Sequence, residues 1–201
     1  MKKIVKNLLY RTPRLLAETM RIKSNWNRDK YVFLKLLRKG DTVLDVGGNI
    51  GDYRTTFAKT VGPNGHVHTF EPVPPTIENL EGTILKEHLK NVTLVKKAVS
   101  NLAGNIEIHM PGDDHARPSI GSPKRKSWDI SENIRSFPCE ATTLDLYMHE
   151  NSLERVDFLK IDVEGAEYLV LEGGNDLLAS HQPILFFEMW DSYMHDFGTT
   201  P

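Results

Sequence analysis

The sequence predicts an α/β protein with a doubly wound, mainly parallel sheet of the Rossmann-like kind. From Asp41 onward, short apolar segments alternate with longer segments of helical periodicity, which is the order of a β–α–β protein. The apolar segments are nearly continuous, as in strands that are buried on both faces. The chain has 201 residues, 39% of them hydrophobic, which suits one domain with a single core.

The elements follow in order along this region. Helices are expected at about 26–38, before Val61, at 75–89 and around 167–179. Strands are expected at 42–46, 66–70, 92–95, 156–163 and 183–189. Right-handed crossovers place the carboxyl ends of parallel strands at one edge of the sheet, where ligands of such folds bind. Functional side chains should therefore follow the strands directly.

Residues 1–39 form a basic arm ahead of an acidic remainder. They hold 12 of the 25 Lys and Arg residues but 2 of the 27 acidic residues. Apolar residues at helical spacing predict short amphipathic helices there, with the main domain at 40–201. Such an arm is typical of a solvated helical face, and it leaves a peripheral membrane contact or a nucleic-acid contact as alternatives.

Cysteine content and hydropathy bear on the compartment. Cys139 is the single cysteine, so a disulfide within one chain is excluded. The amino-terminal apolar run is interrupted by Lys6 and is too short for a signal peptide, and no stretch approaches the roughly 18 to 20 apolar residues of a membrane span. We expect a cytoplasmic protein.

A glycine-rich turn follows the first strand, in the segment V-L-D-V-G-G-N-I-G that ends at Gly51. Glycines after an acidic strand end allow a tight turn whose backbone approaches a ligand, with helix-terminal N–H groups facing it. An adenosyl cofactor is the expected ligand, and a turn that serves packing alone is the alternative. The dinucleotide fingerprint G-x-G-x-x-G does not fit, because Asn49 and Asp52 occupy its second and third glycine positions when Gly47 is the first.

Acidic residues follow two other strands. Glu71, in H-V-H-T-F-E-P, is placed to accept hydrogen bonds from ribose hydroxyls. The segment K-I-D-V-E-G-A-E puts Asp162 and Glu164 beside the cofactor, since ionised carboxylates at the end of an apolar strand favour a polar cleft. Glu167 is expected to be exposed to solvent. Carboxylates alone do not define a metal site, and no metal is expected.

Several of these motifs occur in one order. D-V-G-G-N-I-G, F-E-P, K-A-V-S, T-T-L-D and V-D-F-L-K-I-D-V-E-G-A-E with V-L-E-G follow one another as in the FkbM-type methyltransferases, which the sequence resembles from about Asp41 to Glu188. The resemblance implies a class I S-adenosylmethionine fold and methylation of hydroxyls on polyketides, sugars or glycolipid-like acceptors. It assigns the methionine end of the cofactor to Asp45, Gly47, Gly48, Asn49 and Gly51, the ribose to Glu71, and the adenine to Ala98, Val99 and Ser100. Asp162 and Glu164 would stand near the transferring methyl group.

Two departures from the family pattern stand out. Gly48 replaces the usual alanine, which loosens the turn. The chain also ends at Pro201, soon after P-I-L-F-F-E-M, whereas the family continues into a further helix and an antiparallel strand pair. The last strand is therefore expected to be an apolar edge, which points to a truncated, inactive module or to a homodimer that covers the edge.

Methyl transfer to an oxygen requires few catalytic residues, but a general base assists it. Asp162 and His115 are the candidates. His115 lies in a polar segment at about 111–137, which is either a mobile active-site loop or disordered. The pair Pro138–Cys139 supports a less favoured alternative, a nucleic-acid methyltransferase with a cysteine nucleophile. A cofactor-binding or inactive remnant is the alternative from another class.

Overall fold

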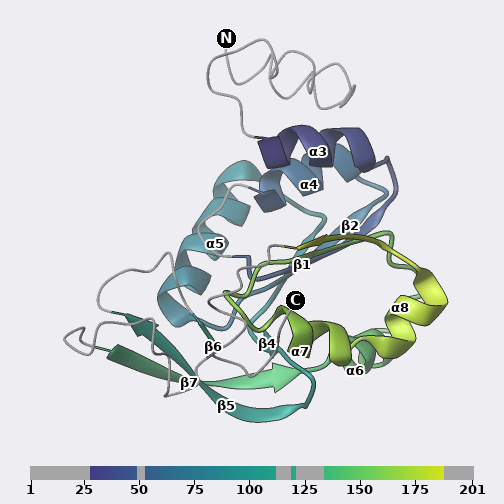
Figure 1. Ribbon diagram of the computed structural model, residues 1–201. Helices are drawn as coiled ribbons and strands as arrows, with labels where there is room; N and C mark the ends of the chain where they lie inside the picture. Colours follow the sequence, from purple (N-terminus) through teal and green to yellow (C-terminus); the bar gives the residue numbers. More distant parts are fainter. Residues whose placement is uncertain (1–27, 49–52, 112–118, 121–133, 188–201) are drawn as a thin grey trace.

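The computed structural model describes residues 28–48, 53–111, 119–120 and 134–187. Their centre is a parallel sheet in the order β3-β2-β1-β8-β9 (Figure 1). The strands are β1 (Thr42–Val46), β2 (His66–Phe70), β3 (Val92–Val95), β8 (Phe158–Ile161) and β9 (Ile184–Phe187). The order reverses at β1, which pairs with β2 on one side and with β8 on the other. The prediction of a doubly wound parallel sheet is thus confirmed.

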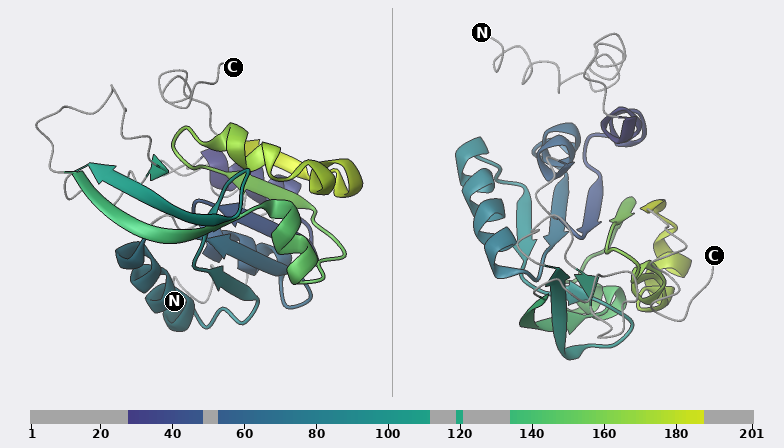
Figure 2. Two further views of the ribbon diagram at one scale, coloured as in Figure 1. Left: turned by 90° about the horizontal axis from the view of Figure 1, so that it is seen from below. Right: turned by 60° about the vertical axis from the view of Figure 1, so that its left-hand side comes forward.

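Helices cover both faces of this sheet (Figures 1 and 2). The helices α3 (Arg28–Leu36), α4 (Tyr53–Val61) and α5 (Pro74–Glu87) lie on one face, and α6 (Leu144–Glu150), α7 (Glu167–Glu172) and α8 (Asn175–His181) lie on the other. The strands are mainly apolar because their side chains alternate between two cores. Val43 packs against Phe33 and Phe57 on the first face, whereas Leu44 packs with Leu144 and Val170 on the second.

Local sequence explains where the helices begin and end. Prolines start α5 at Pro74, where a missing N–H costs nothing, and His88 ends it in the left-handed conformation with φ 53°. The Thr143 hydroxyl accepts a hydrogen bond from the Leu146 N–H at 3.0 Å and caps α6. The single helix expected around 167–179 is in fact two, α7 and α8, separated at Gly173.

Close approach of another segment explains that break. A Cβ atom at Gly173 would lie 2.2 Å from the backbone oxygen of Ser100. The chain after β3 therefore packs directly against the junction between α7 and α8, and only glycine permits the contact.

A second sheet has the order β4-β7-β5-β6, and its longest members form a ribbon that extends past the helices (Figure 2). Its strands are β4 (Ala98–Val99), β5 (Gly104–Pro111), β6 (Ser119–Ile120) and β7 (Ile134–Thr142). The expected irregular segment at about 111–137 is therefore too long at both ends, and β6 falls inside it. Alternating apolar residues explain the ribbon, since Ile108 packs with Val73 and Ala98 on its inner face. The choice between a mobile and a disordered loop concerns residues outside the described ranges.

Among the described strands, β9 is the outer member of the central sheet next to β8, and it carries exposed apolar side chains. Ile184, Leu185 and Phe187 are exposed by 44%, 40% and 38%. Residues 1–27, which include most of the predicted basic arm, lie outside the described ranges, so the domain boundary at 39/40 stays a prediction. Among the helices that the structure describes, none is both long and apolar enough to span a membrane.

Candidate active site

Three turns meet where the strand order reverses, at the carboxyl ends of β1, β2 and β8. The N–H groups of Gly47 and Gly48 both donate to the oxygen of Phe70, at 3.2 and 3.0 Å. The N–H of Asp162 donates to the oxygen of Val46 at 3.0 Å. In open α/β sheets ligands bind in the crevice at such a point, so these turns define the candidate site.

The glycine pair is required by the chain around it. Gly47 has φ 79°, and a Cβ atom there would lie 1.9 Å from the backbone oxygen of Asp162. A Cβ atom at Gly48 would lie 2.4 Å from the Thr69 methyl group. The turn after β1 therefore lies directly against the turn after β8. Two further residues predicted for this turn, Asn49 and Gly51, lie outside the described ranges.

Asp45 lies beneath this turn and is fully buried. Its Oδ1 atom is 3.4 Å from the Nζ atom of Lys160, and its Oδ2 atom accepts a hydrogen bond from the Thr69 hydroxyl at 3.4 Å. The predicted role of Asp45 at the methionine end of the cofactor stays a prediction. The structure joins Asp45 to a residue for which the sequence predicted no role.

That residue is Lys160, in the middle of β8. Its ammonium group donates to the Gly47 oxygen at 2.9 Å and lies 3.2 Å from the Oδ2 atom of Asp162. Burial by itself lowers the pKa of Lys160, but the carboxylates of Asp45 and Asp162 outweigh it and raise the pKa. A lysine within the apolar run V-D-F-L-K-I was the sequence feature that could have revealed it.

Glu71 follows β2 as predicted, and it is almost completely buried. Its Oε1 atom accepts a hydrogen bond from the Val73 N–H at 2.9 Å, and its own N–H donates to the Val95 oxygen at 3.0 Å. The carboxylate thus holds the turn that leads into α5 at the same edge of the sheet as the glycine pair.

The residues predicted to flank the adenine lie in and directly after β4: Ala98, Val99 and Ser100. All three are buried, and the Ser100 N–H donates to the Thr142 oxygen at 2.9 Å. Ala98 belongs to the same apolar cluster as Val73, two residues after Glu71. The structure therefore brings the segments predicted for ribose and adenine next to each other.

The turn after β8 is clamped by Glu167, and the expectation that this side chain is exposed was wrong. Glu167 is 3% exposed, and its Oε1 atom accepts hydrogen bonds from the N–H groups of Val163 and Gly165 at 3.1 and 3.2 Å. The clamp is needed because Glu164 and Gly165 both have positive φ, 56° and 110°. Asp162 and Glu164 are partly exposed at the ends of this turn.

Two other expectations concern reactive side chains. His115 lies outside the described ranges. Cys139 lies in β7, opposite Ile106, where burial and the nearby Glu71 carboxylate raise the pKa of its thiol to about 11. A thiol that is protonated at neutral pH is a poor nucleophile, which argues against a nucleic-acid methyltransferase with a catalytic cysteine. Within the described residues, no group of three His, Cys, Asp or Glu side chains is arranged to hold a metal ion.

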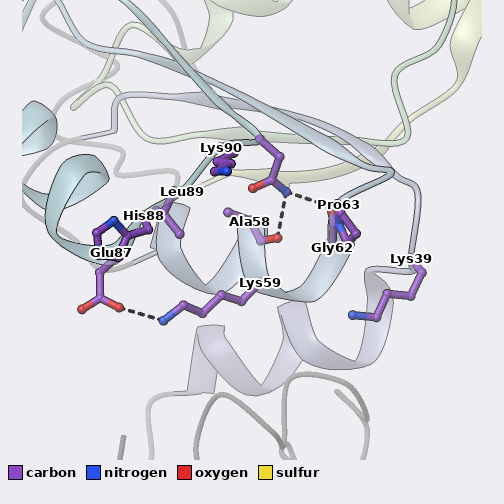
Figure 3. Close-up of a pocket in the computed structure, with 10 residues that line it drawn as sticks. Lys39, Ala58, Lys59, Gly62, Pro63, Glu87, His88, Leu89 and Lys90 are labelled. Carbon is purple, nitrogen blue, oxygen red and sulfur yellow. Dashed lines mark hydrogen bonds and ion pairs between the residues drawn. The ribbon is translucent and has the colours of Figure 1, made fainter. Parts of the chain in front are cut away.

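A pocket of about 610 Å³ lies at the opposite edge of the sheet (Figure 3). It is lined by residues that end α4 and α5, among them Lys59 and Glu87, which form an ion pair at 2.9 Å. The Asn91 amide group donates to the oxygens of Ala58 and Gly62 and closes the pocket floor. Basic side chains at helix carboxyl ends offset the helix dipole, so this pocket has a structural explanation.

Comparison with known proteins decides the family. The model of the FkbM methyltransferase domain matches residues 45–198, which include the three turns of the site. The chain belongs to the FkbM methyltransferase family. As an FkbM methyltransferase it has S-adenosylmethionine as its cofactor, and its fold is that of the class I Rossmann-like methyltransferases.

The relatives of this FkbM protein include two that match most of its length. It is 28% identical over 180 residues to 2-O-methyltransferase NoeI of Sinorhizobium fredii, covering 81% of this chain and 69% of that one. It is 30% identical over 149 residues to Methyltransferase 1 of Beauveria bassiana, covering 67% of this chain and 58% of that one. The chain thus spans 69% and 58% of the lengths of these two relatives.

A solved FkbM methyltransferase, from Methylobacillus flagellatus, shares the fold. The two superpose with a TM-score of 0.54 at 15% identity, over 79% of this chain and 35% of the solved one. A precorrin-6y C5,15-methyltransferase from Geobacter metallireducens gives a TM-score of 0.50 at 13% identity, over 88% and 71% of the two chains. Both likenesses concern the architecture alone.

The hydrogen-bonding groups and the charge at this edge of the FkbM protein suit its cofactor. A buried carboxylate at the end of β2, Glu71, suits a diol such as a ribose, whose hydroxyls are costly to leave unpaired. The cluster of Asp45, Lys160 and Asp162 has a net charge of −1, which suits a ligand that carries a positively charged sulfur. Both features lie at the edge where the strand order reverses.

Proposed function

We propose that this FkbM protein transfers the methyl group of S-adenosylmethionine to a hydroxyl oxygen of a sugar, glycolipid or natural-product acceptor. The similarity to 2-O-methyltransferase NoeI, over 81% of this chain, is the observation that carries the choice of oxygen and of a sugar-like acceptor. The family membership supports the methyl transfer itself.

We further propose that the crevice between β1 and β8 holds the reaction. Glu71 would bind the ribose, the segment from Ala98 to Ser100 would flank the adenine, and the turn at Gly47 and Gly48 would receive the methionine end. The burial of Glu71 beside the glycine turn supports this placement, because a carboxylate there meets a ligand away from bulk water.

The reaction asks little chemistry of the protein. S-adenosylmethionine, when bound, supplies a methyl group on a positively charged sulfur, from which an acceptor oxygen displaces it in line. The chain contributes position, because holding acceptor and methyl in line removes most of the entropic cost of the encounter. The acceptor hydroxyl also loses its proton, and Asp162 and Glu164, both partly exposed after β8, are the carboxylates that we propose to accept it.

Calorimetric titration tests the cofactor site first. The protein should bind S-adenosylmethionine and not NAD, and Glu71→Ala should weaken S-adenosylmethionine binding by about tenfold or more, since a hydrogen bond to a charged group is worth about 1.5 to 3 kcal/mol. Glu78→Ala is the matched control, because Glu78 is exposed on α5. A folded protein that binds neither cofactor would contradict the proposal and favour an inactive module.

The acceptor is tested with methyl-labelled S-adenosylmethionine. Label should pass to hydroxylated acceptors in a panel of sugars, glycolipids and polyketide alcohols, and it should not pass to oligonucleotides. Label on nucleic acid alone would overturn the proposed acceptor class while leaving the cofactor site in place.

A further inference from the structure

A lysine is buried in the centre of the apolar sheet. Lys160 is 2% exposed, and in the sheet it lies between Asp45 of β1 and Phe186 of β9. Its neighbours along the strand, Leu159 and Ile161, belong to the core of the second face. Burying an ammonium group costs several kcal/mol, and an aliphatic side chain would fill such a position at less cost. The position of this charge therefore calls for an explanation beyond packing.

The polar contacts of the Lys160 ammonium group lie near the carboxyl ends of β1 and β8. From β1 it meets the Asp45 carboxylate at 3.4 Å and the Gly47 oxygen at 2.9 Å. From the end of its own strand it meets Asp162 at 3.2 Å, and from α4 it meets the face of the Tyr53 ring at 5.6 Å. The ammonium group thus joins the glycine turn to the acidic turn across the site.

The two acids differ in their surroundings. The Asp45 side chain is 1% exposed, whereas the Asp162 side chain is 29% exposed and reaches the crevice. Among the described residues, the Oδ1 atom of Asp45 accepts no hydrogen bond of good geometry, so the ion pair with Lys160 is what compensates this buried oxygen. Without Lys160, two carboxylates would face each other across a low-dielectric space, and they would repel.

We propose that Lys160 is a positioning residue of the methyl-transfer site: its ammonium group holds the carboxylate of Asp162 and the Gly47 turn together, and so sets the shape of the crevice that receives the cofactor. This inference rests on the proposed function, because it assumes that S-adenosylmethionine binds between these turns. It assigns Lys160 no contact with the reacting atoms.

The first variant removes the charge. Lys160→Met keeps an unbranched apolar chain of similar length, so a loss through packing alone should be small. At pH 8 we expect S-adenosylmethionine binding to weaken by about tenfold or more, because the carboxylates of Asp45 and Asp162 then repel each other.

The second variant restores the charge balance. Lys160→Met with Asp45→Asn removes one positive and one negative charge, and the cluster keeps its net charge of −1 with Asp162 intact. Binding at pH 8 should recover in part, because the repulsion is removed, but it should stay below that of the wild-type protein, because the contacts of the ammonium group with Gly47 and Asp162 are still missing. Lys59→Met is the matched control, since it removes a largely buried lysine from an ion pair with Glu87 far from the crevice and should leave binding unchanged.

The outcomes separate the two proposals, with circular dichroism confirming that each variant is folded. If the wild-type protein does not bind S-adenosylmethionine, the proposed function fails, and the role of Lys160 fails with it. If the wild-type protein binds and Lys160→Met binds equally well, the positioning role alone is overturned. It is also overturned if the loss in Lys160→Met is not reduced by Asp45→Asn, because the loss then comes from packing. If Lys160→Met does not fold, the double variant decides by the same criterion of binding at pH 8.

Discussion

His68 should make the stability of the protein fall as the pH drops below neutrality. The side chain lies on β2 and is 8% exposed, with its Nδ1 atom 2.8 Å from the Tyr147 hydroxyl of α6. Burial and, to a lesser extent, the nearby His66 lower the pKa of His68 from 6.5 to about 4. Burial raises the pKa of Tyr147 to about 12, so the phenol keeps its proton and is able to donate a hydrogen bond to the Nδ1 atom of a neutral imidazole.

The sign of the effect follows from proton uptake. Below pH 6.5 the imidazole is protonated in the unfolded chain, whereas in the folded protein it stays neutral until about pH 4. The unfolded state therefore binds more protons in this window, and the stabilisation is complete above pH 6.5 and is lost as the pH falls through the window. At pH 5.0 the difference in proton binding by this one group corresponds to a loss of about 2 kcal/mol relative to pH 7.5.

Urea denaturation at pH 7.5 and 5.0 measures this loss. Because carboxylates also titrate, the relevant quantity is the difference between the wild-type protein and His68→Gln, which lacks the imidazole. The wild-type protein should lose about 2 kcal/mol more than the variant between the two pH values. His149→Gln is the control, since His149 is exposed on α6 and should leave the pH dependence unchanged. An equal loss in the wild-type protein and His68→Gln would refute the reasoning.

Three further predictions follow from close contacts. Gly173→Ala should lower the free energy of unfolding in urea by about 1 to 3 kcal/mol, because the new Cβ atom would meet the Ser100 backbone. Gly82→Ala is the control: this residue lies in open space on α5, so the substitution should raise the free energy of unfolding by about 0.5 to 1 kcal/mol. Equal effects would contradict the packing argument. At pH 7.5, Cys139 should react with a disulfide reagent much more slowly in the folded protein than in the protein unfolded in urea, because burial raises the pKa of the thiol to about 11. Equal rates would show that the thiol of the folded protein is accessible and ionised. Glu167→Ala should lower the free energy of unfolding in urea by about 2 to 4 kcal/mol, because two backbone N–H groups of the turn after β8 lose their acceptor. The same substitution should weaken S-adenosylmethionine binding. Unchanged binding would show that this turn is not part of the cofactor site.

The central sheet could be predicted because its strands are unusually explicit in the sequence. T-V-L-D-V and H-V-H-T-F became β1 and β2 without any shift in their ends. Continuous apolar runs specify burial on both faces, and glycines or acids directly after them specify where the strands stop. The positions of Glu71 and Asp162 at the ends of β2 and β8 follow from the same pattern.

Features that depend on distant contacts were not predictable in this way. Residue 173 must be a glycine because the Ser100 backbone approaches it, and nothing near residue 173 in the sequence indicates that neighbour. Glu167 is buried because the turn before it needs an acceptor, although an acid in the first turn of a helix is more often exposed. The start of strand β7 could not be predicted, because polar residues precede it and period-two alternation is a weak pattern at the end of a polar segment.

The pairing of β1 with β8 has a consequence for how the protein is made. The Lys160 ammonium group and the Gly47 oxygen that it contacts are 113 residues apart in the chain, and the strands that carry them are adjacent in the sheet. Closing so long a loop is slow compared with forming local helices. The crevice needs both strands, so it cannot exist on a ribosome-bound chain until β8 has emerged. Cofactor added during synthesis should therefore protect the nascent protein from proteolysis only after that point.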